Sequence, residues 1–413
     1  MTATSASVTT LNALFKTQYI NTLMQQSVAD KIARPLTALL RDAGSIEKNS
    51  FGRGASYPVI YERPSTSATF TTAQTNGSRV TPAEFNPTVI GHLFSPFQIT
   101  TDAIYRAMGD KAAFMGMVEF AVAQHTAAVA DDLEQALFAS GAGELATTVN
   151  TTTGTTVQLT AGEDVWKFKV GDELVFGSDL GVAVQSGSVA VTAISFDGDD
   201  GYLTVESIAS NIGGGAIEDG YYVFRSGSSA GASTNPLPTG LLAYATSNTS
   251  LHGLNNSTHY RLMIPTVTGD LTDPVAAIQE AQMLLQKIGP LGKASAVFVP
   301  WNVWVTISQQ VDSDNRDKAG GLGEKGYNAL RIVGPQGPMD VLGSKYVQAN
   351  TCWLVDPKTF KLCHVGPQLV DLEKASGQVL KVRDALDAVE GRVAARCQLL
   401  CLVPAANARI TLS

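Results

Sequence analysis

The sequence predicts an α+β fold in which extended β structure and one long helix come first and an α/β region comes last. Three observations support this prediction. Residues 46–100 contain two strand-like segments around a polar tip, residues 110–140 have the apolar spacing of one helix, and residues 142–235 break into short alternating strands joined by Gly/Asp turns. From residue 236 onward helical and strand-like segments alternate, so the strand-rich stretch is predicted to be a domain inserted into a host fold.

The composition is that of a folded protein with a largely covered surface. Of 413 residues, 44% are hydrophobic and 16% are charged, against roughly 25% charged in ordinary globular proteins. Interface cores are depleted in charge in the same way, although a Gly/Thr/Ser-rich β protein also dilutes charge. The formal net charge is −8, and residues 141–235 alone carry 12 acidic and 3 basic side chains. No Lys/Arg run indicates a dedicated nucleic-acid binder.

No targeting or membrane signal is visible. No apolar run approaches the roughly 18 residues that span a bilayer, and residues 1–19 lack the charged and apolar regions of a secretory signal. We therefore expect the chain to stay in a cytosol with reduced cysteines. Cys397 and Cys401 lie along one predicted strand, about 13 Å apart and too far for a disulfide. Cys352 and Cys363 would face each other across a four-residue hairpin loop, but free thiols are favoured there too.

The first 100 residues contain little core of their own. Residues 1–45 are predicted to be an N-terminal arm, and residues 46–100 an extended β-hairpin loop with strands at 57–63 and 86–100. An isolated two-stranded ribbon is marginal in water, and ordering each residue costs roughly 1–2 kcal/mol. We expect the missing cover to come from another copy of the chain. A disordered loop is the alternative.

Residues 101–141 are predicted to contain one long helix. Glycine at position 141 is typical of a helix stop, and His125 falls on the apolar stripe, where a packed core histidine is favoured over a ligand or pH switch. The stripe has the 3.6-residue period of an amphipathic helix and comprises Phe114, Met117, Val118, Ala121, Val122, His125, Val129, Leu133, Ala136 and Leu137.

The inserted segment, 142–235, is predicted to be a small antiparallel barrel or sandwich flanked by Gly- and Ser-rich connectors. The last region, 236–413, begins with Asp273 and Pro274, an N-cap and a first-turn proline, before a helix that ends near residue 288. A buried strand then precedes a second helix over 301–311, and residues 312–328 are predicted to be a polar, Gly-rich loop. Further strands follow, and the longest runs from Val389 to Val403.

Several patterns that suggest chemistry lack the context they need. Gly321–Gly326 matches G-x-G-x-x-G, but a charged loop precedes it and a strand-like run follows, whereas the dinucleotide fingerprint requires a strand before and a helix after. Gly227–Gly231 matches G-x-S-x-G but does not lead into a helix. The acidic cluster of Asp197, Asp199 and Asp200 lacks calcium-loop spacing and is predicted to be a hairpin turn. The sequence therefore predicts no catalytic, metal or cofactor site.

The order of elements resembles a known family. The loop GASYPVIYERPSTSATF…NPTVIGHLFSPFQIT, the helix DKAAFMGMVEFAVAQHTAAVADDLEQALF, the strand-then-helix VFVPWNVWVTISQQ and the strand VLGSKYVQAN are together similar to tailed-bacteriophage major capsid proteins of the Hong Kong 97-type fold. None of these is a strict signature, and the inserted β domain departs from the minimal family pattern. The resemblance covers nearly the whole chain outside 142–235.

The resemblance implies a structural, non-enzymatic and cofactor-free role. Copies would form pentamers and hexamers of an icosahedral shell around packaged double-stranded DNA, contacted non-specifically. A separate scaffolding protein, a portal and cement or decoration proteins would be partners. The shell would be assembled in the bacterial host cytoplasm and would end as the virion capsid. Residues 101–141 would be the spine helix, crossed by a neighbour's 46–100, and 236–413 the axial domain with returning peripheral strands.

The expected assembly interface follows from that placement. The alternatives are an encapsulin-like compartment, which shares the fold but holds cargo protein, and a monomeric α/β enzyme using Gly321–Gly326. The interface residues we predict are Tyr57, Ile60, Tyr61, Arg63, Phe70, Arg79, Phe85, Phe94, Phe97, Phe114, Val118 and Val122.

Overall fold

The chain divides into two compact units. The first contains Arg34 and residues 90–239 and 364–397, and the second contains residues 35–89, 240–363 and 398–413. The computed structural model describes residues 34–48, 57–59, 71, 83–85, 90–102, 111–180, 185–197, 200–228, 237–246, 250–251, 254–255, 260–288, 293–316, 330–366, 369–372, 381–382 and 387–413.

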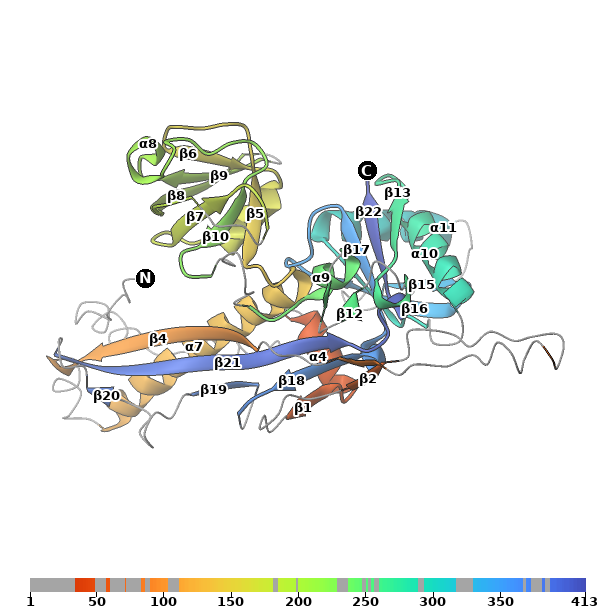
Figure 1. Ribbon diagram of the computed structural model, residues 1–413, viewed down its shortest axis with the longest axis horizontal. Coiled ribbons are helices and arrows are strands. Elements are labelled where there is room, and N and C mark those ends of the chain that lie inside the picture. Colours follow the sequence, from red (N-terminus) through yellow and green to blue (C-terminus); the bar gives the residue numbers. More distant parts are fainter. Residues whose placement is uncertain are drawn as a thin grey trace. The chain divides into compact units, whose positions relative to one another are not determined.

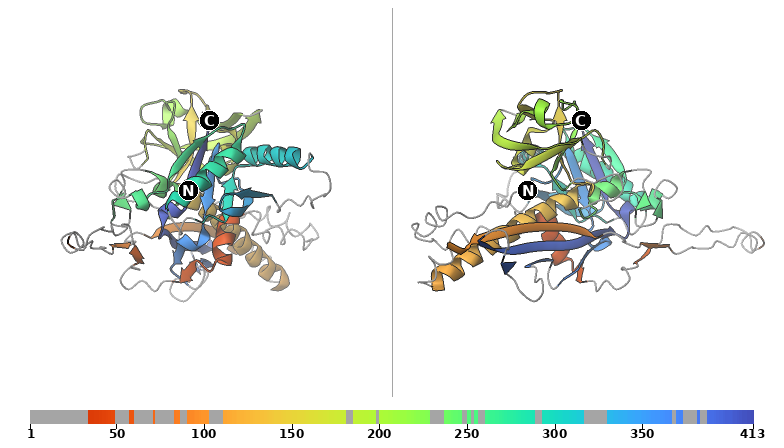
Figure 2. Two further views of the ribbon diagram at one scale, coloured as in Figure 1. Left: turned by 90° about the vertical axis from the view of Figure 1, so that its right-hand side faces the viewer. Right: turned by 60° about the vertical axis from the view of Figure 1, so that its left-hand side comes forward.

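In the first unit a long helix lies along a pair of long strands (Figure 1). Helix α7 (Lys111–Phe138) confirms the predicted long helix, and Gly141 follows it with a φ of +93°. Strand β4 (Gly91–Thr100) pairs antiparallel with β21 (Ala388–Cys401) along its whole length. The right-hand view of Figure 2 shows α7, β4 and β21 side by side from another direction. Two short strands also pair with β21, β19 (Val370–Leu372) and β20 (Lys381–Val382).

The pairing of β4 corrects one prediction. Residues 86–100 were expected to pair with 57–63 in a single hairpin, but residues 91–100 pair with β21 instead. Phe97 and Ile99 explain the choice, since both are buried in a core that also includes Val129 of α7. The apolar face of β4 is therefore covered within the chain. The hairpin ladder that remains joins β2 (Tyr57–Val59) to β3 (Ala83–Phe85).

The inserted domain is a closed antiparallel barrel, which decides between the barrel and sandwich alternatives. Its strand order is β10-β5-β6-β9-β8-β7, and Figure 2 shows its strands closing around one centre. Its core is its own, with Val157, Leu174, Phe176, Leu203 and Val223 each fully buried. The elements are β5 (Glu144–Val149), β6 (Thr156–Leu159), η2 (Gly162–Lys167), β7 (Glu173–Gly177), β8 (Val189–Asp197), β9 (Asp200–Val205), α8 (Ile208–Asn211) and β10 (Tyr222–Arg225).

The second unit is built on a mixed sheet of order β13-β22-β17-β14-β16-β15. Helices α10 (Pro274–Ile288) and α11 (Trp301–Arg316) share an apolar core with this sheet. Asp273 caps α10 as predicted, because its Oδ1 accepts from the Ala276 amide at 3.1 Å. The strands are β13 (Thr266–Gly269), β14 (Ala296–Val299), β15 (Arg331–Gly334), β16 (Gly337–Gly343), β17 (Thr351–Val355) and β22 (Ala408–Leu412).

Two further predictions are settled in this unit. Residues 312–316 were expected to begin the polar loop but continue helix α11, whereas residues 317–329 lie outside the described part of the chain. Cys352 and Cys363 lie in strands of different sheets, so they do not oppose each other, and all four cysteines are free and buried. The smaller elements are α4 (Pro35–Asp42), β1 (Ile46–Lys48), α9 (Leu241–Ala245), β11 (Ser250–Leu251), β12 (Leu254–Asn255), η3 (Tyr260–Leu262), η4 (Pro357–Thr359), β18 (Phe360–His364) and η5 (Pro404–Ala406).

Candidate functional site

The predicted interface residues fall into three groups. The structure describes the side chains of Tyr57, Phe94, Phe97 and Val122. It places Phe85 in β3 and Phe114 and Val118 in α7 by backbone alone. Outside the described residues lie Ile60, Tyr61, Arg63, Phe70 and Arg79.

Two of the described side chains are used within the chain. Phe97 is 3% exposed, in the core between β4 and α7. The hydroxyl of Tyr57 lies 3.0 Å from Cys363 Sγ and donates to Glu47 Oε2 at 3.3 Å. Burial is the largest cause of a raised Tyr57 pKa, and the neighbouring thiol and carboxylate add to it. Phe97 is thus covered without a neighbour.

His125 packs as the sequence predicted. Its Nδ1 lies 2.7 Å from Ser95 Oγ, and its ring centroid lies 5.5 Å from that of Phe97. Burial lowers the pKa of His125, and the positive charge of Lys169 lowers it further. The imidazole is therefore favoured in its neutral form, as suits a packed core histidine.

Phe94 remains open to solvent on β4, with 47% of its surface exposed. Its ring stacks on His92 at 5.9 Å between centroids, and the Arg396 guanidinium lies over it at 5.6 Å. Burial lowers the pKa of His92, as does the charge of Arg396. The exposed aromatic is thus held by a stacked ring and a cation–π contact.

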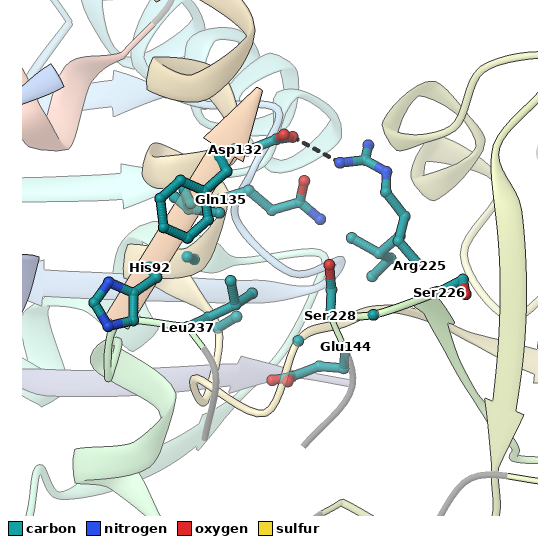
Figure 3. A pocket seen from close by; sticks show the side chains of 15 residues that line it. His92, Asp132, Gln135, Glu144, Arg225, Ser226, Ser228 and Leu237 are labelled. Carbon is teal, nitrogen blue, oxygen red and sulfur yellow. Dashed lines mark hydrogen bonds and ion pairs between the residues drawn. The ribbon is translucent and has the colours of Figure 1, made fainter. Parts of the chain in front are cut away.

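A cavity of about 410 Å³ lies beside Phe94, where α7, β4 and the two ends of the inserted barrel come together. Figure 3 shows Asp132 and Gln135 facing Arg225 across this space, with Glu144 and Ser228 at its lower edge. It is the junction at which the inserted domain is attached to its host. The sequence indicated flexible connectors here and no site.

Arg225, the last residue of β10, joins the barrel to the helix. Its Nη1 donates to Asp132 Oδ1 of α7 at 2.9 Å, and its Nε lies 3.4 Å from Asp172 Oδ2. Its Nη2 donates to the Lys167 carbonyl at 3.0 Å. Burial lowers the pKa of Arg225, but the two carboxylates outweigh that effect and raise it overall. One guanidinium therefore holds two barrel segments and the long helix together; we call this set the junction cluster.

Two neighbouring groups complete the junction. Glu144 accepts from the Ser140 amide at 2.7 Å and from its hydroxyl at 2.8 Å, which closes the turn out of α7. Gln135 is 8% exposed, and its Nε2 has no partner among the described residues. Gly91 lets the chain returning from the barrel touch β4, since a Cβ there would lie 2.1 Å from the Pro238 nitrogen. These contacts fit a structural attachment and contain no nucleophile–base pair.

The motifs set aside in the sequence stay outside any site. Asp197 and Asp200 are paired across the β8–β9 hairpin, as predicted for a turn. Gly321–Gly326 and the serine of the G-x-S-x-G match, Ser229, lie outside the described residues. In the part of the chain that the structure describes, no group of three His, Cys, Asp or Glu residues is placed to hold a metal, and no helix has the length and apolar character to cross a membrane.

Among known proteins, the architecture is that of phage capsid chains. A chain of the cyanophage A-1(L) capsid is similar over 92% of this chain and 93% of its own length, with 10% identity and a TM-score of 0.52. A capsid chain of a native GTA particle covers 91% and 90% with 13% identity (TM-score 0.46), and one of Gordonia phage Cozz covers 91% and 86% with 10% identity (TM-score 0.43).

No family model matches the sequence, and no curated protein does either. The argument therefore rests on the A-1(L) chain, the comparison whose TM-score exceeds 0.5 among those given. At 10% identity the likeness establishes a shared fold. This chain thus has the fold of a phage capsid subunit.

Proposed function

We propose that the chain is a major capsid protein: a structural, non-catalytic subunit whose copies form the pentamers and hexamers of an icosahedral shell around packaged double-stranded DNA. The observation that carries the proposal is the fold shared with the A-1(L) capsid chain over 92% of one chain and 93% of the other. Because the likeness extends over nearly all of both chains, it is not explained by one common module. The Hong Kong 97-type order of elements in the sequence supports the same function.

Helix α7 supports the expectation of cover from a second copy. Val129, towards its C-terminal end, is 2% exposed, whereas Ala121 and Val122 are only partly buried. The stripe is thus less covered towards its middle. We propose that residues 46–100 of a neighbouring copy lie across this part of the helix. Phe94, exposed on β4, belongs to the same proposed interface.

The remaining partners follow from the proposed shell. A scaffolding protein encoded separately, a portal and cement or decoration proteins would act with the chain, and assembly would take place in the bacterial host cytoplasm. The net charge of −8 favours non-specific, transient contact with DNA over tight binding. The strongly acidic segment 141–235 is best placed away from packaged DNA, on the outer face of the virion.

Electron cryomicroscopy of particles formed by the full chain tests the proposal. We expect closed shells built from rings of five and six subunits, and nuclease-protected double-stranded DNA in particles from infected cells. Dispersed single subunits would support the enzyme alternative, and shells filled with protein instead of DNA would support the encapsulin alternative.

The loop proposal has its own test. Deleting residues 65–80 should leave folded subunits that fail to close shells. A matched variant in which the same residues are kept in scrambled order separates loop length from loop sequence. Normal particles from the deletion would refute a role for this loop in assembly, while leaving the shell function itself intact.

A further inference from the structure

Two exposed aromatic rings meet on the inserted barrel. Trp166 is 71% exposed and Phe196 is 47% exposed, and their ring centroids lie 6.3 Å apart with a tilt of 38°. Trp166 comes from η2 and Phe196 from β8. Isolated apolar side chains on a surface are ordinary, but a tryptophan in contact with a second open ring is a built feature that the barrel core does not use.

A glycine makes this pairing possible. Gly201 of β9 is the register partner of Phe196 in β8. A Cβ on Gly201 would lie 2.6 Å from the Gly162 carbonyl oxygen and 3.1 Å from Val165 Cβ, so η2 packs directly on this residue. The close approach places Trp166 beside Phe196. The ring pair is therefore fixed by backbone packing and not by chance rotamers.

Carboxylates surround the rings. Glu163 precedes Trp166 by three residues in a 3₁₀-helix, in which residues three apart lie on the same side. Asp197 and Asp200 are exposed at the end of the hairpin that carries Phe196. The nearby cation Lys167 is already paired with Asp164 at 2.6 Å and donates to the Leu145 carbonyl. The face therefore offers apolar rings within a negative rim.

We propose that Trp166, Phe196, Glu163, Asp197 and Asp200 form a docking site for a basic segment of a second protein. An arginine or lysine of that partner would lay its methylene groups against the rings and direct its charge to the rim, since indole faces attract cations and exposed carboxylates steer basic partners. Nucleic acid does not fit, because the segment 141–235 holds 12 acidic and 3 basic residues. The 38° tilt also differs from the flat platform on which a sugar ring stacks. The site goes beyond the proposed shell function and does not depend on it.

Calorimetric titration of the full chain with synthetic peptides tests the site. The probes are a peptide of arginine, lysine and leucine and its charge-reversed analogue of aspartate, glutamate and leucine. We expect the basic peptide to bind and the acidic one not to. Trp166→Ala should weaken binding at least tenfold, and Glu163→Gln should weaken it several-fold and reduce its salt dependence. Glu206→Gln, which removes an exposed charge at the far end of β9, is the matched control and should bind as the unaltered chain does.

Every other result counts against the proposal. Equal binding by the Trp166→Ala chain, equal binding of the acidic peptide, or no binding of the basic peptide at millimolar concentration would overturn it. Tighter binding of a maltose or chitin oligosaccharide would reassign the rings to carbohydrate. Because Trp166 and Glu163 are exposed, hydrogen exchange of the barrel core should be unchanged in both variants and serves as the folding control.

Discussion

Replacing Arg225 with methionine should loosen the inserted barrel while leaving the rest of the chain intact. Methionine keeps most of the aliphatic packing of Arg225 but removes its three contacts, to Asp132, Asp172 and the Lys167 carbonyl. The three charged side chains differ in exposure, at 16% for Arg225, 37% for Asp132 and 3% for Asp172. The loss should therefore be felt mainly through Asp172, whose carboxylate stays buried.

The magnitude follows from that asymmetry. Removing one partner of a buried ion pair costs about 3–5 kcal/mol, since the other charge is left uncompensated. Asp172 keeps one donor, the Lys169 amide at 3.1 Å, so the lower end, about 3 kcal/mol, is expected. At about 1.4 kcal/mol per factor of ten, barrel opening should become roughly a hundred times more frequent. Asp132→Asn removes only a partly exposed contact and should cost about 0–1 kcal/mol.

Hydrogen exchange of the full chain, read peptide by peptide, is the suitable assay because it reports local opening. Amides of β7 and β10 should exchange faster in the Arg225→Met chain, and those of β14 and β17 in the second unit should not change. Adding Asp172→Asn to Arg225→Met should recover part of the loss, as expected for coupled sites. Unchanged exchange in β7 and β10, or an Asp132→Asn effect as large as that of Arg225→Met, would refute the reasoning.

Three other perturbations follow from the structure. Gly91→Ala should lower the stability of the first unit by about 1–3 kcal/mol, because a Cβ would lie 2.1 Å from the Pro238 nitrogen; Gly154→Ala, which has open space, is the control in a thermal melt. Gln282→Leu should raise the urea midpoint of the second unit, since this side chain is fully buried and neither amide atom has a partner among the described residues; a lower midpoint would show that the amide is bound. Burial raises the pKa of Cys352 from 9.0 to about 12, so between these values the unfolded chain loses its proton first and this residue's contribution to stability falls as pH rises. Urea midpoints measured from pH 8 to 11 should fall less steeply in Cys352→Ala, and parallel curves would count against the assignment.

Local patterns were sufficient for elements that are stable through their own sequence. The helix predicted over 110–140 is α7, because one apolar stripe and a terminal glycine specify it. The alternating strands and Gly/Asp turns of 142–235 form the barrel, because consecutive strands are joined by short connections and pair mostly with near neighbours. In both cases the information lies within a few tens of residues.

Partner choice between distant segments was not predictable in the same way. Residues 91–100 have the same alternation whether they pair with 57–63 or with β21, which lies about 300 positions later in the chain. The end of α11 was also missed, because residues 312–316 are polar and look like loop when taken alone. Tertiary context decides both, and a single sequence contains no measure of it.

The junction cluster shows the same limit for a site. Its members Asp132, Asp172 and Arg225 belong to a helix, a turn and a strand, and no spacing rule connects them. One signal was present: Arg225 is one of three basic residues in the acidic segment 141–235. An isolated cation among many carboxylates is a reasonable candidate for a structural ion pair, but composition does not say which carboxylates it joins.

The barrel is the reason to regard this cluster as more than a stabilising contact. The barrel is closed and has a full core of its own, so it does not need the long helix in order to fold. A buried charge cluster is also a poor source of net stability compared with apolar packing. What Arg225 supplies, and what two flexible connectors could not, is a fixed direction for the barrel on its host helix. In a subunit that repeats around a shell, such a direction would set where every copy of the insertion points, so the orientation of the barrel is the property on which we expect Arg225 to act.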